Sequence, residues 1–137
     1  MNADRLFLDA NVLFSAAYRE DSALARLWTL RRAELLTSAY AVEEARINLL
    51  ETEQRRRLAG LSLRMRIVTE VGLLPAGISL ADKDRPILQA AIGAHASHLL
   101  SGDKQHFGRY FGRRLGGVLI LPPASYFPLY RRRFGTR

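Results

Sequence analysis

The chain has 137 residues, of which 48% are hydrophobic, so it is long and apolar enough for one domain with a sizeable core. It contains no cysteine, which excludes disulfide bonds and thiolate metal sites. The formal net charge is +8, and Lys83 and Lys104 are the only lysines, so nearly all the cations are arginine. Arginine suits bidentate contacts with phosphates, which favours a polyanionic partner. A solvated arginine-rich surface is the alternative explanation of the same charge.

No signal for a membrane or for export is found. No apolar run approaches the roughly 18 residues that suggest a spanning helix. The chain enters its first predicted strand without a basic and then apolar leader. We therefore expect one cytoplasmic domain over residues 1–137, without membrane association.

Short apolar runs alternate with helical periodicity along the chain. Strands are predicted at residues 6–8, 35–38, 70–74, 98–101 and 118–121. Helices are predicted at about 11–18, 22–30, 40–60, 61–67, 85–96, 105–111 and 126–133, with Gly60 ending the long third one. This alternation is typical of an α/β domain with a mainly parallel sheet.

Acidic residues recur where the predicted strands end. Asp9 and Asp103 each follow an apolar run, and Asp84 opens a predicted helix. Glu44, or its neighbour Glu43, lies one turn into the helix after the second strand. Because the carboxyl ends of parallel strands form one edge of a sheet, we expect these acids to converge there. Gathered carboxylates need a compensating cation, and Mg2+ is a hard ion that takes oxygen ligands.

Each acid also has a purely structural explanation. The three aspartates precede helices, where a carboxylate serves as an N-cap. The paired glutamates are typical of a solvated helix face. An acidic pocket in a basic protein, however, is what a divalent ion acting on a phosphodiester requires.

Four successive segments resemble the motifs of PIN domains. They are residues 8–13, residues 37–38 with the glutamates at 43–44, residues 84–91 and residues 99–103. The resemblance covers nearly the whole chain. It implies a single three-layer α/β domain whose mainly parallel five-stranded sheet has the order 3-2-1-4-5, and a metal-dependent ribonuclease activity.

The resemblance also implies particular site residues. A Mg2+ or Mn2+ ion and the catalysis would depend on four acids: Asp9, Glu44, Asp84 and Asp103. Asn11 and Ser101 match supporting positions beside these carboxylates.

Two of these assignments have competitors. Glu44 is preferred to Glu43 because it stands six residues after Ser38, the spacing expected of the family. Asp84 is preferred to Asp82 because the Pro-Ile-Leu run of its motif begins just after it.

Three histidines and two arginine clusters remain. A metal site could use His95, His98 or His106, but packing or surface roles are preferred for all three, because Mg2+ prefers oxygen to imidazole. The candidates for binding RNA phosphates are Arg55, Arg56, Arg57, Arg131, Arg132 and Arg133. For the second cluster, a docked closing helix with solvated charges is the alternative.

The resulting hypothesis is an endoribonuclease that hydrolyses RNA with Mg2+ or Mn2+ and an activated water. Many PIN domains are toxins of toxin–antitoxin pairs and dimers are common among them, so the resemblance implies an antitoxin and a homodimer as protein partners. A non-catalytic RNA-binding or assembly module that retains the fold is the alternative. A phosphoacceptor receiver domain is disfavoured, because it has adjacent acids and a late lysine that this sequence lacks.

Overall fold

Strands and helices alternate along residues 3–135, the part of the chain that the computed structural model describes. The strands are β1 (Asp4–Leu8), β2 (Ala33–Thr37), β3 (Arg66–Ile67), β4 (His98–Leu100), β5 (Arg114–Leu115) and β6 (Val118–Leu121). The helices are α1 (Ala10–Tyr18), η1 (Ala23–Thr29), α2 (Ala39–Asn48), α3 (Thr52–Leu63), α4 (Arg85–Gly93), α5 (Lys104–Phe107), η2 (Gly108–Tyr110) and α6 (Pro123–Phe134), where η marks a 3-10 helix. Within these residues, no helix is both long and apolar enough to cross a bilayer.

The sheet has the strand order β3-β2-β1-β4-β6-β5. Every neighbouring pair is parallel except β5 and β6, which are antiparallel. The predicted mainly parallel sheet of order 3-2-1-4-5 is therefore confirmed, with β6 as its fifth strand. β5 is an additional edge strand that we did not predict. It turns into β6 through Gly116 and Gly117, whose φ angles of 56° and 86° favour glycine.

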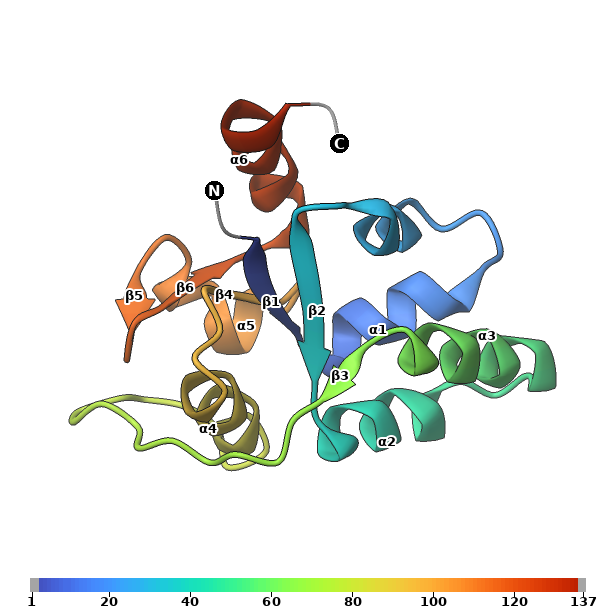
Figure 1. Ribbon diagram of the computed structural model, residues 1–137. Helices are drawn as coiled ribbons and strands as arrows, with labels where there is room; N and C mark the ends of the chain where they lie inside the picture. Colours follow the sequence, from blue (N-terminus) through green and yellow to red (C-terminus); the bar gives the residue numbers. More distant parts are fainter. Residues whose placement is uncertain (1–2, 136–137) are drawn as a thin grey trace.

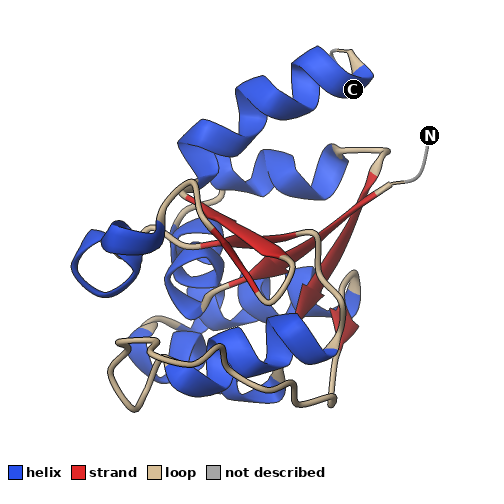
Figure 2. Cartoon of the chain, turned by 90° about the vertical axis from the view of Figure 1, so that its left-hand side faces the viewer, coloured by secondary structure: helices blue, strands red, loops and turns tan. Residues whose placement is uncertain are grey.

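The central strands are buried on both faces. Leu6, Phe7 and Leu8 of β1 have no exposed surface, and neither have Leu99 and Leu100 of β4. A strand covered on both sides needs apolar residues at consecutive positions, which explains the unbroken runs in the sequence. Figure 1 shows α1, α2 and α3 on one side of the sheet and α4 on the other. In Figure 2 the strands lie between helices above and below.

A topological switch point lies at the centre of the sheet. β1 stands between β2 and β4, so the chain leaves β1 toward one neighbour and returns later to the other. Loops diverge at such a point and leave a crevice at the carboxyl ends of the two strands. Asp9 follows β1 and Ser101 follows β4, so both lie at this point.

The last helix is fastened to the first strand. α6 buries Tyr126, whose hydroxyl donates to Asp4 Oδ2 (2.7 Å). The Arg133 guanidinium donates to the other oxygen of the same carboxylate (2.6 Å). Asp4 is 3% exposed, so these contacts satisfy a carboxylate that burial would otherwise leave unpaired. The docked closing helix is thereby confirmed.

One predicted helix boundary is wrong. The helical stretch that begins near residue 40 breaks at residues 49–51, and Gly60 lies inside α3. Glu51 and Gln54 form a capping box at the start of α3, in which the Glu51 N–H donates to the Gln54 side chain (3.1 Å). This reciprocal cap satisfies the first turn of a new helix, so it sets the boundary that we had assigned to the glycine.

The third strand is also misplaced in the prediction. It lies at Arg66–Ile67, where it pairs with Leu36 and Thr37 of β2, and not at residues 70–74. The helix predicted at 61–67 is correspondingly absent, because α3 ends at Leu63. Arg66 and Ile67 are exposed, so the apolar pattern that marks a buried strand does not occur there.

Residues 70–74 instead cross the end of α4 at close range. The Gly72 N–H donates to the carbonyl of Gln89 in α4 (2.8 Å). A Cβ added at Gly93 would lie 2.7 Å from Gly72 N and 2.8 Å from Val71 N. The backbone of each segment therefore lies where a side chain of the other glycine would be, so only glycine fits at Gly72 and Gly93.

Gly93→Ala should lower the free energy of unfolding by about 1–3 kcal/mol, because the added methyl group forces the two backbones apart. Gly60→Ala is the matched control, since a Cβ there meets nothing within 4 Å. Alanine is the better helix former, so this control should gain about 0.5–1 kcal/mol. Urea denaturation followed by circular dichroism measures both. Wild-type stability of Gly93→Ala would contradict the close crossing.

Candidate metal centre

Asp9 joins β1 to α1, and both of its carboxylate oxygens are held. Oδ1 accepts from the backbone N–H of Ala10 (2.7 Å), and Oδ2 accepts from the Ser101 hydroxyl (2.8 Å). The Asp9 N–H donates to the Leu100 carbonyl (3.0 Å), which ties the residue to the end of β4. Asp9 thus caps α1 through one oxygen, as the structural explanation expects, and turns the other toward Ser101.

Asn11 and Ser101 link the loops that follow β1 and β4. Asn11 Nδ2 donates to Asp9 Oδ2 (3.1 Å), and its Oδ1 accepts from the Gly102 N–H (2.7 Å). The Ser101 hydroxyl oxygen accepts from the Asp103 N–H (3.1 Å). The two residues predicted as supports therefore contact Asp9 directly and set the path of the chain into Asp103.

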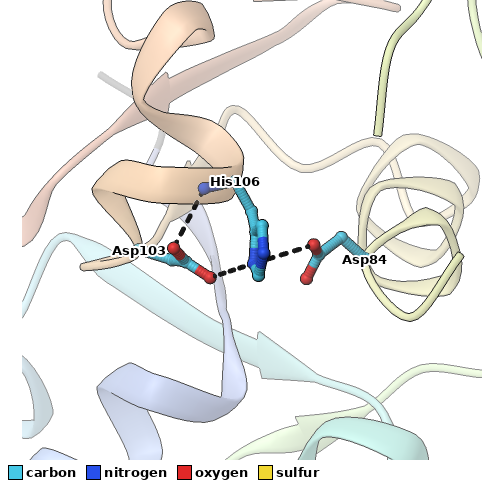
Figure 3. Close-up of side chains that lie close together, drawn as sticks. All are labelled: Asp84, Asp103 and His106. Carbon is cyan, nitrogen blue, oxygen red and sulfur yellow. Dashed lines mark hydrogen bonds and ion pairs between the residues drawn. The ribbon is translucent and has the colours of Figure 1, made fainter. Parts of the chain in front are cut away.

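Asp84, Asp103 and His106 form a compact group at the same edge of the sheet. One ligand atom from each lies within 4.8 Å of the other two. His106 Nδ1 is 2.7 Å from Asp103 Oδ2 and 3.2 Å from Asp84 Oδ2. Figure 3 shows the imidazole between the two carboxylates, with Asp84 reaching it from the start of α4.

The Asp84 carboxylate holds the one buried side-chain nitrogen or oxygen atom of the described residues that has no hydrogen bond. It is 6% exposed, and its Oδ2 has no hydrogen-bond partner, because His106 Nδ1 hydrogen-bonds to Asp103 instead. Burial raises the pKa of Asp84, and the nearby charges of His106 and Lys83 oppose that shift. A buried carboxylate oxygen without a donor, next to a second carboxylate, fits a hard divalent cation.

Burial also dominates the electrostatics of Asp9. It raises the pKa of this carboxyl from the ordinary 3.8 to about 6, although the hydrogen bonds from Ser101 and Ala10 lower it. The negative charges of Asp84 and Glu44 raise it further. The carboxylates at this edge therefore lie close enough to repel one another, which a bound cation relieves.

The two glutamates of α2 face different surroundings. Glu43 is exposed and pairs with Arg46 (2.6 Å), whose hydrogen bond lowers the pKa of Glu43. Glu44 is half-buried and lines a cavity of about 320 Å3 together with Asn11. The structure thus places Glu44, and not Glu43, on the side of Asp9.

The described structure brings the predicted acids together only in part. Asp84 and Asp103 belong to the compact group, whereas Asp9 and Glu44 stand outside it. Asp82 is exposed while Asp84 is buried, so the geometry favours Asp84 of that pair.

His106 differs from the role predicted for it. His95 is exposed in a turn, and His98 is buried edge-on against Tyr126, as packing or surface roles require. His106 instead lies between Asp84 and Asp103 and pairs with both, a contact that the prediction did not include. Its spacing of three residues from Asp103 on a short helix was the signal that could have indicated the contact.

Two of the three arginines on α3 have structural partners. Arg55 Nε donates to the carbonyl of Leu49 (2.7 Å), and Arg57 Nε donates to the carbonyl of Ala17 (2.9 Å). Both contacts satisfy carbonyls at the ends of helices. Arg56 is exposed and pairs with a glutamate on its own helix. Much of this cluster therefore stabilises helix ends.

The C-terminal arginines lie far from the acids. Arg133 contacts Asp4, the first residue of β1, whereas Asp9 follows the last residue of the same strand. Arg131 and Arg132 are exposed on the same end of α6. This cluster thus stands at the amino edge of the sheet, opposite the candidate site.

Comparisons with known proteins support the fold. No family model matches the chain, and no curated protein matches it. A chain in the crystal structure of VapBC2 from Rickettsia felis, bound to a DNA fragment from their promoter, is similar with a TM-score of 0.63. The two are 14% identical, over 86% of this chain and 98% of that chain. At this identity the likeness shows the fold, and the predicted PIN-like fold is confirmed.

Asp9→Asn should be more stable than wild type by about 1–3 kcal/mol at pH 7.5 in EDTA. Above pH 6 the wild-type fold holds a charged, buried carboxylate at a cost in stability, because its pKa is about 6 when folded and 3.8 ordinarily. As the pH falls through 6 toward 4, the folded state binds a proton that the unfolded state does not. The difference between variant and wild type should therefore vanish near pH 4.

Asp82→Asn is the control for this experiment, since Asp82 is exposed and its charge costs nothing by burial. It should match wild type at both pH values in chemical denaturation. A wild type more stable than Asp9→Asn at pH 7.5 would show that the cap needs the charged carboxylate.

Proposed function

We propose that the protein is a metal-dependent endoribonuclease that hydrolyses RNA phosphodiester bonds. The single observation that carries this proposal is the buried Asp84 Oδ2, which receives no hydrogen bond, beside Asp103 at the carboxyl edge of a PIN-like sheet. A binding module has no use for such a group, because an unsatisfied buried carboxylate destabilises the fold. A metal site does have a use for it, because a divalent ion supplies the partner that the carboxylate lacks.

The chain's own residues would divide the work at this site. Asp84 and Asp103 offer the ligand oxygens of the compact group, and Asp9 contributes a further carboxylate at the same edge. Ser101 and Asn11 orient Asp9 by their hydrogen bonds. When bound, a Mg2+ or Mn2+ ion supplies positive charge to the scissile phosphate and activates a water for in-line attack.

Glu44 would act from the other side of Asn11. It lines the cavity of about 320 Å3, whose wall also includes Phe14 and Asn48. This hollow lies next to Asp9 along α1, so it gives the nucleotide beside the cleaved bond a place to bind. Glu44 would then add its negative charge to that of Asp9 in holding the ion.

The proposal extends to partners. The similar chain comes from a structure of VapBC2 bound to promoter DNA. We propose a cognate antitoxin as the protein partner of this chain, and a homodimer as a further assembly. RNA is the proposed substrate, and the charge of +8 favours its capture.

Asp9→Asn, Asp84→Asn and Asp103→Asn should each reduce Mn2+-dependent cleavage of a mixed RNA pool by at least about 100-fold. The reason is that each change keeps the side-chain shape but removes the charge that holds a hard ion. Glu44→Gln should do the same, whereas Glu43→Gln is its matched control and should cut nearly normally. Gel electrophoresis with Mn2+ and with EDTA measures the rates.

Thermal melts of every variant accompany the assay, so that a lost fold is not mistaken for lost catalysis. If Asp84→Asn folds and still cleaves RNA at the wild-type rate, the acids have a structural role and not a catalytic one. If wild type cuts neither RNA nor single-stranded DNA, the protein is a non-catalytic module of the same fold.

The arginines make a separate prediction about binding. Arg131→Gln with Arg132→Gln should weaken RNA binding and flatten the dependence of log affinity on log salt by about 0.7 for each phosphate that is no longer neutralised. Arg56→Gln tests the other cluster without removing the structural contacts of Arg55 and Arg57. Fluorescence anisotropy at several salt concentrations measures the slope. An unchanged slope would assign that cluster to solvent.

A further inference from the structure

His106 is fixed in place by the short helix on which it lies. Its backbone N–H donates to Asp103 Oδ1 (3.0 Å), so Asp103 caps α5 and also sits beside the imidazole. Phe107, the next residue, has no exposed surface and anchors the helix in the core. The His106 side chain is 27% exposed, and its ring lies against the carboxylates rather than in solvent.

The atoms of the group already have the spacing of adjacent ligands. Two ligands at right angles on an octahedral ion, each at about 2.1 Å, stand about 3 Å apart. His106 Nδ1 is 2.7 Å from Asp103 Oδ2 and 3.2 Å from Asp84 Oδ2. Without an ion, an Nδ1–H donated to Asp103 accounts for the first distance. When the ion takes the Nδ1 lone pair, that proton is released to solvent and the neutral imidazole keeps its proton on Nε2. The second distance is an ion pair without hydrogen-bond geometry, so the Asp84 oxygen still lacks a hydrogen-bond donor.

We propose that His106 is itself a metal ligand, through Nδ1, and that it makes the site prefer Mn2+ over Mg2+. The inference rests on the metal site of the proposed function, but not on RNA cleavage. Three features support it: the buried Asp84 oxygen that receives no hydrogen bond, the ligand-like spacing of the three side chains, and the anchoring of the imidazole by α5.

The preference follows from the chemistry of the ligands. Mg2+ and Mn2+ both bind carboxylate oxygens well, so the acids alone do not distinguish them. Mn2+ is a first-row transition metal and gains more from an imidazole nitrogen than Mg2+ does. Two carboxylates and one neutral imidazole also bring less negative charge together than three carboxylates would. The site therefore favours Mn2+ through its nitrogen and not through the number of its acids.

His106→Asn is the test variant, because it replaces the nitrogen donor with an amide oxygen in a shorter side chain. His95→Asn is the matched control. His95 is exposed at a φ of 55°, a conformation that asparagine tolerates better than most residues. Both variants and wild type are titrated with MnCl2 and with MgCl2 alone, without RNA, by calorimetry at pH 7.5. Pulsed electron paramagnetic resonance of the Mn2+ complexes then detects any bound nitrogen.

Wild type and His95→Asn should show a histidine 14N coupling to Mn2+, and His106→Asn should show none. The ratio of the Mg2+ to the Mn2+ dissociation constant should fall at least tenfold in His106→Asn and stay unchanged in His95→Asn. Wild type without nitrogen coupling, or His106→Asn with an unchanged ratio, would overturn the proposal.

If His106→Asn fails to fold, wild-type protein labelled with 15N-histidine replaces it. The 14N coupling to Mn2+ should then be replaced by a 15N coupling, and a 14N coupling that persists would overturn the proposal. The outcome is also separable from the proposed function. Nitrogen coupling without RNA cleavage would reject the nuclease and keep the ligand. Cleavage without nitrogen coupling would keep the nuclease and reject His106 as a ligand.

Discussion

Negative charge buried where β1 and β4 end is the constraint on which the candidate site depends. Asp9 is 3% exposed, and Ser101 and Ala10, which donate hydrogen bonds to its carboxylate, are both neutral. Burial therefore outweighs hydrogen bonding and raises the pKa of Asp9 to about 6. The fold tolerates this because the apolar residues of the two strands anchor the same backbone. The buried charge thus costs stability locally, and the proposed cation would offset that cost.

The same constraint explains why this edge could be located from the sequence. An apolar run that ends on an acid is a strong pattern, because the run fixes the strand and the acid then falls at its carboxyl end. Asp9 and Asp103 were placed in this way. Glu44 and Asp84 needed the family resemblance, since a helix face and a loop offered nearby competitors of the same charge. Their orientations follow from Arg46, which binds Glu43, and from the burial of Asp84.

Other features depend on contacts that no local pattern reveals. His106 meets Asp84 only because α5 and the start of α4 are brought together by the sheet. β3 was misplaced because its residues are exposed and its strand is defined by pairing with Leu36 and Thr37. The arginines show the same limit: composition counts Arg55 and Arg57 as free charge, whereas they bind helix-end carbonyls. The basic surplus therefore overstates how many cations are available to bind a polyanion.

The attachment of α6 to Asp4 has a consequence for how the chain acquires its structure during synthesis. The Asp4 carboxylate accepts hydrogen bonds from the Tyr126 hydroxyl and the Arg133 guanidinium. These two residues are 122 and 129 positions later in the sequence. Until those residues have left the ribosome, β1 cannot bury its first residue without an unpaired carboxylate. The strand at the centre of the sheet is thus among the first segments made and among the last to be completed. A nascent chain that lacks α6 therefore has an unpaired carboxylate at the start of its central strand, which opposes completion of the sheet before synthesis of the helix.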